Sequence, residues 1–362
     1  MKILTVGGAT IDTIAIIDSD RIERMTMLNA ESSFLLLEAG RKTEAGEIST
    51  HPGGGAVNAA VAMARLDLDV AVLAKLGTDA RADAVLARLA QEGVSSRWTM
   101  RDKRQPTGAS VFVSSHDRDA AIFTFRGANT LLEAEDLRDD AFAVDVVYIA
   151  NLSNESADCF PAIVARAKAH GALIAANPGP RQLSARGQAF LENLPAIDIL
   201  LLNRREADLL VPSLVARAGE GGATLPLAPG EEAPALAARG LVGGGFEMGI
   251  AAYFRALMHL GPKYLVVTDG ARGAFVGSAG QILFAPSVVS SVVGTAGAGD
   301  AFGATFTAYV ALGRPIEEAL RAAAINSAAV VGHIDTQTGL MRRQELDRRL
   351  TESEPCIRRW AV

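Results

Sequence analysis

The chain has 362 residues and a mass of 37.8 kDa, enough to bury a large core, and its 49% hydrophobic but only 5% aromatic residues predict a core of Ala, Val, Leu and Ile. A net charge of −6 argues against nucleic acid or an anionic membrane as the main partner, although a local site can still bind an anion. No apolar run reaches the ~18 residues of a membrane span. The two cysteines match neither a disulfide framework nor a metal motif, which fits a reducing compartment. We therefore expect a cytoplasmic protein that does not bind membranes.

The first 125 residues combine a buried strand with a small β-structure. Residues 2–7 form an apolar run that predicts a first strand, and Asp12 follows near its carboxyl end, where ligands bind in open α/β sheets. Weak alternation without a helical period predicts a flap of strands in three segments, 13–18, 34–50 and 107–125. Between them, the pattern predicts a helix over 56–66, a strand over 70–76 and a helix over 79–91.

A βα rhythm in the rest of the chain predicts a mostly parallel sheet covered on both faces, within a single domain over residues 1–362. The strands are expected at 144–150, 172–176, 197–202 and 264–268, with two short strands in 270–284. The helices are expected at 155–169, 204–210, 246–260, 315–332 and 342–350. Residues 211–245, rich in Gly and Pro, predict a surface insertion.

The segment Val293–Thr307 predicts a glycine-rich turn that opens a buried helix. Gly297, Ala298 and Gly299 precede a single acid, Asp300, and an apolar run follows. The unpaired N–H groups and the dipole of a helix N-terminus attract phosphate. A carboxylate beside such an anion site suits a proton acceptor for a hydroxyl that attacks a phosphoryl group. From these residues alone, Asp300 could equally be a helix cap.

A second glycine-rich break lies at 51–55 and also precedes a helix of small residues. Asn58 falls in the first turn of that helix, where its amide can point at a ligand. The glycines allow the backbone to approach a ligand closely.

Together, the two motifs resemble those of the ribokinase (PfkB) family of carbohydrate kinases. They read P-G-G-G-A-V-N-A-A-V-A-M-A-R-L over 52–66 and G-T-A-G-A-G-D-A-F-G-A over 294–304. Further elements occur in the family's order: Gly8 with Asp12, 126–129 (R-G-A-N), Asn177-Pro178, 203–206 (N-R-R-E), 268–273 (T-D-G-A-R-G) and Asn326. The resemblance implies an α/β fold, a ribokinase-like three-layer sandwich with a central mostly parallel sheet and a small β-strand lid.

The resemblance also implies ATP-dependent phosphorylation of a hydroxyl of a small sugar. In that case Asp300 is the catalytic base, and the backbone N–H groups of Gly297, Ala298 and Gly299 form an anion hole. The positions that match sugar-binding residues are Asp12, Gly53, Gly54, Asn58, Asn129 and Asp300. Carboxylates and amides suit a polyol because they accept and donate paired hydrogen bonds.

ATP and Mg²⁺ are the implied cofactors. The positions that match the nucleotide site are Asn203, Thr268, Gly270, Gly273 and Asn326. Asn203 and Glu206 match the element that organises Mg²⁺ through water, as a hydrated ion prefers. The flap matches a lid that closes over the sugar and excludes water, and that pairs two subunits into a homodimer.

Three positions depart from the family's pattern. Gly294 stands where an Asp usually begins the second motif, which leaves a requirement for a monovalent cation such as K⁺ in doubt. Gly55 stands where ribokinase-like members often carry Lys, which weakens a strict ribose assignment. Asp269 replaces a commoner apolar residue in the nucleotide loop.

Other functions remain to be weighed against a sugar kinase. A nucleoside kinase, adenosine-like or inosine-like, would share the fold and the base. A nucleotide-binding protein without turnover is a further alternative, which the intact motifs make less favourable. An NAD-dependent dehydrogenase is discarded, because the first strand is not followed by the G-x-G-x-x-G fingerprint with its acid ~20 residues on.

Overall fold

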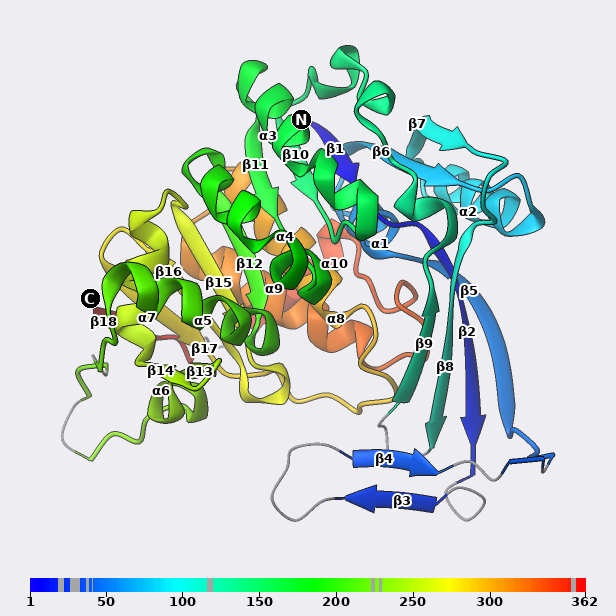
Figure 1. Cartoon of the computed structure of the whole chain (residues 1–362). Helices are drawn as coiled ribbons and strands as arrows, with labels where there is room; N and C mark the ends of the chain where they lie inside the picture. The colour runs from blue at the N-terminus through cyan, green and yellow to red at the C-terminus, as the bar shows by residue number, and fades with distance from the viewer. Residues whose placement is uncertain are drawn as a thin grey trace.

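The computed structural model describes residues 1–18, 23–26, 33–36, 39–40, 42–115, 120–222, 225–227, 230–352 and 356–362. Within these residues, a twisted ten-stranded sheet forms the centre of the molecule (Figure 1). Its strand order is β18 (Arg358–Ala361), β17 (Gln281–Ala285), β16 (Ala274–Ser278), β15 (Tyr264–Thr268), β12 (Ile199–Asn203), β11 (Leu173–Ala176), β10 (Val146–Ile149), β1 (Lys2–Val6), β6 (Asp69–Leu76) and β7 (Ser95–Arg101). The strands from β15 to β7 run parallel, and β16, β17 and β18 are antiparallel to their neighbours.

Helices cover both faces of this sheet, so the sheet separates two apolar cores. In β1, Ile3 contributes to one core while Leu4 and Val6 contribute to the other, as the alternation of a strand requires. The Ile3 side carries α1 (Gly55–Arg65), α2 (Ala80–Gln91), α8 (Ala298–Ala311), α9 (Ile316–Val330) and α10 (Arg343–Glu352). The Leu4 side carries α3 (Phe160–Ala169), α4 (Pro180–Asn193), α5 (Arg204–Ala218), α6 (Ala235–Arg239) and α7 (Ile250–His259).

The predicted α/β fold with a mostly parallel central sheet is therefore confirmed. Local boundaries agree where caps are strong: the Asp79 side chain accepts a hydrogen bond from the Ala82 N–H and starts α2. Short 3₁₀ turns connect several elements, at Gly127–Thr130, Ala134–Asp136, Asp139–Phe142, Asn154–Cys159, Leu194–Ala196 and Gly270–Arg272. None of the helices in the described ranges is long and apolar enough to cross a membrane.

Several predicted boundaries were wrong. Helix α5 does not end at 210 but continues through Pro212 to Ala218, so the segment predicted as a surface insertion, 211–245, begins inside a helix whose Leu214 is buried. The helix predicted over 246–260 starts only at Ile250, because β14 (Phe246–Met248) first pairs with β13 (Leu241–Gly243). The pattern also missed the edge strands β7 and β18 and the helix α4, whose charged and polar residues gave little apolar period.

A second sheet projects from the carboxyl ends of the central strands (Figure 1). Its order is β5 (Glu47–Gly53), β2 (Thr10–Ile17), β8 (Gly108–Ser115) and β9 (Ala120–Phe125). A two-stranded sheet of β3 (Glu23–Thr26) and β4 (Ser33–Leu36) lies at its far end. Strands β2, β4, β5, β8 and β9 overlap the three predicted flap segments, 13–18, 34–50 and 107–125. The described residues between β4 and β5 form no strand, and residues 37–38, 41 and 116–119, the expected hairpin tip among them, lie outside the described residues. We call the four-stranded sheet the lid.

Candidate active site

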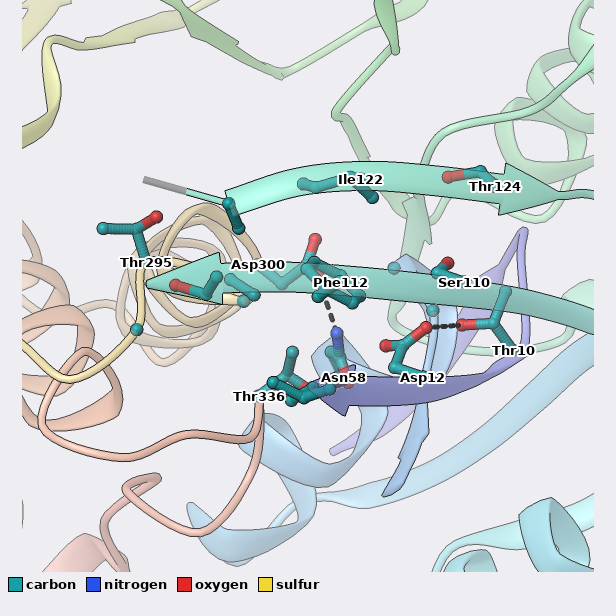
Figure 2. Close-up of a pocket in the computed structure, with 18 of the residues that line it drawn as sticks. Thr10, Asp12, Asn58, Ser110, Phe112, Ile122, Thr124, Thr295, Asp300 and Thr336 are labelled. Carbon is teal, nitrogen blue, oxygen red and sulfur yellow. Dashed lines mark hydrogen bonds between the residues drawn. The ribbon is translucent and has the colours of Figure 1, made fainter. Parts of the chain in front are cut away.

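A cavity of about 1040 Å³ lies between the lid and the carboxyl ends of the central strands. Its walls combine the lid strands with the first turns of α1 and α8, and Figure 2 shows part of the lining. The predicted residues Asp12, Gly54, Asn58, Asn129, Gly297 and Asp300 line it. Segments far apart in sequence therefore meet at one site, as the topology of a parallel sheet predicts.

Asp300 sits in the first turn of α8, but it does not cap the helix. The cap position is Gly297, whose φ of 78° lies in the left-handed region, and in the described part of the chain no side chain caps the start of this helix. A Cβ at Gly297 would also lie 2.6 Å from Thr336 Cβ, so only glycine fits there. The capping alternative for Asp300 was thus wrong, and the N–H groups of the first turn, including those of Ala298 and Gly299, have no side-chain acceptor among the described residues.

The Asp300 carboxylate is held by α1. Asn58 Nδ2 donates a 2.8 Å hydrogen bond to Asp300 Oδ2 (Figure 2). Burial raises the pKa of Asp300 above its ordinary value, and the Asn58 hydrogen bond opposes that rise because it favours the charged form. The carboxylate therefore keeps one fixed amide partner and faces the cavity with the rest of its surface.

Asn58 is itself fixed by a segment that sequence reasoning missed. Its Oδ1 accepts hydrogen bonds from Thr336 Oγ1 at 2.9 Å and from Gln337 Nε2 at 3.0 Å. Gln337 is anchored in turn, because its Oε1 accepts a 2.8 Å bond from Arg88 Nε. Both heteroatoms of the Asn58 amide thus have protein partners, so positioning Asp300 is one role of this residue, and contact with a sugar remains a prediction.

Asp12 forms a second acidic position in the cavity. Thr10 Oγ1 donates a 3.0 Å hydrogen bond to Asp12 Oδ1, and Ser110 on β8 is a further partner. Burial raises the pKa of Asp12, the Thr10 and Ser110 hydrogen bonds lower it, and the nearby charge of Asp300 raises it further. Gly53 makes room for this carboxylate, because a Cβ there would lie 2.1 Å from Asp12 Oδ2.

Two other predicted sugar-binding positions also shape the backbone. Asn129 Oδ1 accepts from the Ala9 N–H at 2.9 Å, and Asn129 Nδ2 donates to the Ala9 carbonyl at 2.8 Å. Gly54 has a φ of 95°, and a Cβ there would meet the Gly8 carbonyl oxygen at 2.6 Å. Both residues therefore fix the loop between β1 and β2, and a direct contact with substrate stays a prediction.

Glu206 lies at the start of α5, at the end of β12. It forms a reciprocal capping box with Asn203: the Asn203 N–H donates to Glu206 Oε2 at 2.8 Å, and the Glu206 N–H donates to Asn203 Oδ1 at 3.0 Å. Burial raises the pKa of Glu206 to about 7, and the charge of Asp300 adds to the rise. Because the charge of Asp300 disfavours the charge of Glu206, a hydrated cation would be favourable near Glu206.

The side-chain oxygens of Asn203 and Glu206 fit a Mg²⁺ ion that arrives with a nucleotide, because Mg²⁺ prefers hard oxygen ligands. The described residues contain no group of three or more His, Cys, Asp or Glu side chains that could hold a metal ion by themselves. A Mg²⁺ ion near Asn203 and Glu206 would therefore need phosphate oxygens of the nucleotide and water molecules to complete its coordination.

The predicted nucleotide loop lies beside Asn203 rather than in the wall of the cavity. Thr268 pairs with Asn203 in register across β15 and β12. Gly270 and Gly273 have φ values of 56° and 105°, so both positions favour glycine. Asp269, unexplained by the sequence, is buried and accepts a bidentate pair from Arg272 at 2.8 and 2.9 Å, which braces the loop.

Asn326 does not reach a surface where a nucleotide could bind. It is 0% exposed. Its Nδ2 donates to Thr305 Oγ1 at 2.8 Å, and its Oδ1 accepts from the Met341 N–H at 2.9 Å. The prediction that it contacts ATP is therefore corrected: Asn326 joins α8 and α9 to the segment before α10.

Gly294 lines the cavity near the segment that follows α9. A Cβ at this position would lie 3.2 Å from the His333 carbonyl oxygen and 3.4 Å from that of Ile334. A larger side chain would need these carbonyls to move by a few tenths of an ångström. A role for K⁺ here stays an open prediction.

Solved structures with this architecture include ribokinases and a nucleoside kinase of the ribokinase family. The putative ribokinase II of E. coli in complex with ATP and Mg²⁺ superposes with a TM-score of 0.72 and covers 97% of this chain and 99% of that one, at 19% sequence identity. At this identity the likeness establishes the fold. The protein thus has the fold of the ribokinase-like sugar kinases.

Sequence comparison narrows this class to one family. The pfkB family carbohydrate kinase profile matches residues 18–224 and 231–343, so the chain belongs to the PfkB family of carbohydrate kinases. The ribokinase of Bacillus subtilis is 26% identical over 340 residues, which cover 91% of this chain and 100% of that protein. The deoxyribokinase of Salmonella typhimurium is 25% identical over 346 residues, which cover 94% and 99%. The protein is a sugar kinase, an enzyme that transfers a phosphoryl group to an alcohol.

Glu206 predicts a pH dependence of stability in the absence of ligands. The unfolded chain loses the Glu206 proton near pH 4.5 and the folded chain near pH 7, so stability from this group falls as pH rises between these values. Glu206→Gln should therefore raise the free energy of unfolding above pH 7 by up to about 3 kcal/mol and have little effect at pH 4.5. Denaturant titrations at both pH values measure this. Equal effects at both would contradict it. Glu345→Gln, which removes an exposed carboxylate on α10, is the control: it should not raise the free energy of unfolding above pH 7.

Replacing Asn326 should lower the stability of the protein without weakening its binding of ATP. Asn326→Ala leaves Thr305 Oγ1 and the Met341 N–H without their buried partners, so the free energy of unfolding should fall by about 2–4 kcal/mol. The KM for ATP should stay within about twofold, since the residue is buried. Thermal unfolding and steady-state kinetics test both parts. A tenfold rise in KM for ATP without loss of stability would restore Asn326 to the nucleotide site.

Proposed function

We propose that the protein transfers the γ-phosphoryl group of ATP to a hydroxyl of a small sugar or sugar derivative, with Asp300 as the general base. One observation carries the proposal: a half-buried carboxylate lies in the first turn of α8, whose start has no side-chain cap among the described residues, and lines the same cavity as Asp12. The helix start offers N–H donors to a phosphoryl group, and Asp300 offers an acceptor for a proton.

The reaction follows from this arrangement. A substrate hydroxyl beside Asp300 loses its proton to the carboxylate as its oxygen forms a bond to the γ-phosphorus, and the bond to the β-phosphate oxygen breaks to release ADP. The N–H groups of Gly297, Ala298 and Gly299 stabilise charge on the transferred group. Bound Mg²⁺, held through water by Asn203 and Glu206, would neutralise charge on the phosphates.

Several features favour a polyol as acceptor. Asp12 and Asn58 line the cavity with Asp300, and Asn151 Oδ1 is buried in the cavity wall without a partner among the described residues. A sugar hydroxyl would donate to that oxygen and remove the penalty of an unsatisfied buried acceptor. The lid would close over such a substrate and exclude water as a competing acceptor.

Thr268, Gly270 and Gly273 would hold the nucleotide beside Asn203. A cytoplasmic location, where ATP is available, belongs to the same proposal.

Asp300→Asn tests the base directly. The substitution keeps the size of the side chain but removes the proton acceptor, so kcat should fall by about 10³-fold or more while the Kd for ATP changes little. Asp12→Asn is the matched variant, and it should raise the KM for the sugar more than it lowers kcat. ADP release across ribose, deoxyribose, fructose, adenosine and inosine measures turnover and separates sugar from nucleoside kinase activity. Undiminished kcat in Asp300→Asn would remove Asp300 from the role of base.

We further propose that two copies pair through the outer face of the lid. Side chains alternate along a strand, so the residues next to the cavity-facing ones point away from the cavity. Four apolar side chains on this outer face are exposed: Ile48 (67%), Val111 (42%), Phe123 (58%) and Phe125 (47%). Val111 and Phe123 are direct cross-strand neighbours, so they form a continuous patch. Such a patch on a projecting sheet is typical of a homodimer interface.

Phe123→Glu tests this pairing. A charge in the centre of the patch should convert a dimer into a monomer at micromolar concentration, as measured by light scattering after size-exclusion chromatography. Val289→Glu, at a residue that is 98% exposed outside the lid, should leave the mass unchanged. A monomeric wild-type protein, or a Phe123→Glu dimer of unchanged stability, would contradict the proposed interface.

A further inference from the structure

A guanidinium group in the cavity is not used by the proposed chemistry. Arg126 directly follows β9 and precedes the turn that contains Asn129, and it lines the cavity together with Ser153. It is half-buried. Arg126 Nη1 donates a 2.6 Å hydrogen bond to Ser153 Oγ. Of its five N–H donors, this is the one with a described protein acceptor.

Arg126 has no counter-charge within the described ranges. In the described part of the chain, no carboxylate forms an ion pair with it, whereas most of the other partly buried arginines do, such as Arg65 with Glu92 at 2.7 Å. Burial and the nearby Arg181 both lower the pKa of Arg126, and no acid offsets them. A half-buried cation without a partner is unfavourable unless a ligand supplies the opposite charge.

The position of Arg126 separates it from the nucleotide side of the site. Its partner Ser153 follows β10, which lies next to β1 in the sheet, and Asn129 holds the loop after β1. The elements proposed to bind ATP follow β12 and β15, and β11 lies between them and β10. Arg205, which also lines the cavity, lies on that nucleotide side. Arg126 is therefore placed to contact the acceptor substrate.

We propose that the acceptor substrate carries an anionic group, a carboxylate or a phosphate, and that Arg126 and Ser153 bind it. This inference rests on the proposed kinase function and names the substrate class of the same site. A guanidinium presents paired N–H donors that match two oxygens of either anion, and the Ser153 hydroxyl can supply a further donor. The substrate would then lie with its anionic end at Arg126 and the reacting hydroxyl at Asp300. Arg126 is in this account a determinant of specificity.

The test compares neutral sugars with charged counterparts. ADP release would be measured with glucose against gluconate, and fructose against fructose 1-phosphate and fructose 6-phosphate, together with 2-keto-3-deoxygluconate. At least one anionic member should have a kcat/KM about 10-fold or more above its neutral counterpart. The carboxylate and phosphate arms identify which anion is used. A neutral sugar turned over as well as every anionic counterpart would overturn the proposal and leave the kinase function intact.

Variants of Arg126 provide the second arm. Arg126→Gln should raise the KM for the preferred anionic substrate about 10- to 100-fold while the KM for ATP stays within about twofold, and Arg126→Lys should recover part of the loss. Arg181→Gln removes a neighbouring exposed charge that does not line the cavity, and it should have a small effect. A rise in the KM for ATP instead of the sugar would assign Arg126 to the nucleotide and contradict the proposal.

Binding to the Asp300→Asn protein separates this proposal from the proposed catalysis. Calorimetric titration of that variant with each anionic sugar reports recognition without turnover. Binding that is lost in the double variant with Arg126→Gln supports the anion site even if Asp300 proves not to be the base. Absence of binding by every anionic sugar, with the neutral sugars bound, would overturn the anion site alone.

Discussion

The site depends on one hydrogen bond, from the Asn58 amide to the Asp300 carboxylate. It joins the first turns of two helices that start after glycines and lie on the same face of the central sheet. A carboxylate at a helix start would otherwise turn back to accept the free N–H groups of its own first turn. In the proposed reaction, the bond from Asn58 leaves those N–H groups free to bind a phosphoryl group and leaves the carboxylate free to accept a proton from a hydroxyl.

Three acids at or near the site have pKa values that their surroundings raise. Asp12, Asp300 and Glu206 all have raised pKa values, chiefly because each is buried. Asp12 and Asp300 line one cavity, and Glu206 lies near enough for the charge of Asp300 to raise its pKa; such perturbed acids are typical of a functional site. Burying three carboxylates close together lowers the free energy of unfolding of the free protein. A bound cation, or a ligand that donates hydrogen bonds from hydroxyl groups, offsets this cost. The free protein and the ligand-bound protein should therefore differ in stability far more than their contacts alone suggest.

The sequence predicted the class of fold well, because it depends on local signals, and it named residues that the structure brings together at one cavity; their roles stay predictions. Apolar runs marked the buried strands, and glycine-rich breaks before small-residue helices marked Asp300 and Asn58. Elements with weak apolar periods, such as α4 and the edge strand β18, could not be found this way. The sequence also could not predict the residues that hold Asn58 in place. Thr336 and Gln337 come from an irregular segment, and only the fold brings them to Asn58, which is 278 and 279 residues away along the chain.

The same limit explains how Asn326 was misplaced and Arg126 overlooked. The resemblance gave Asn326 a contact with ATP, whereas the packing of α8 against α9 buries it completely. Arg126 belonged to a recognised four-residue element, but only the structure shows that it faces the cavity without a described acidic partner. A motif therefore identifies positions, and burial and partners decide what each side chain can do.

The pH dependence of kcat/KM in Asn58→Ala tests the central coupling most directly. The Asn58 amide lowers the pKa of Asp300, so its removal should raise that pKa and move the acidic limb of the profile to higher pH relative to wild type. If Asn58 acted only as a sugar contact, KM would rise and the limb would stay in place. A shifted limb is the result that this account predicts, and an unshifted limb with a raised KM would contradict it.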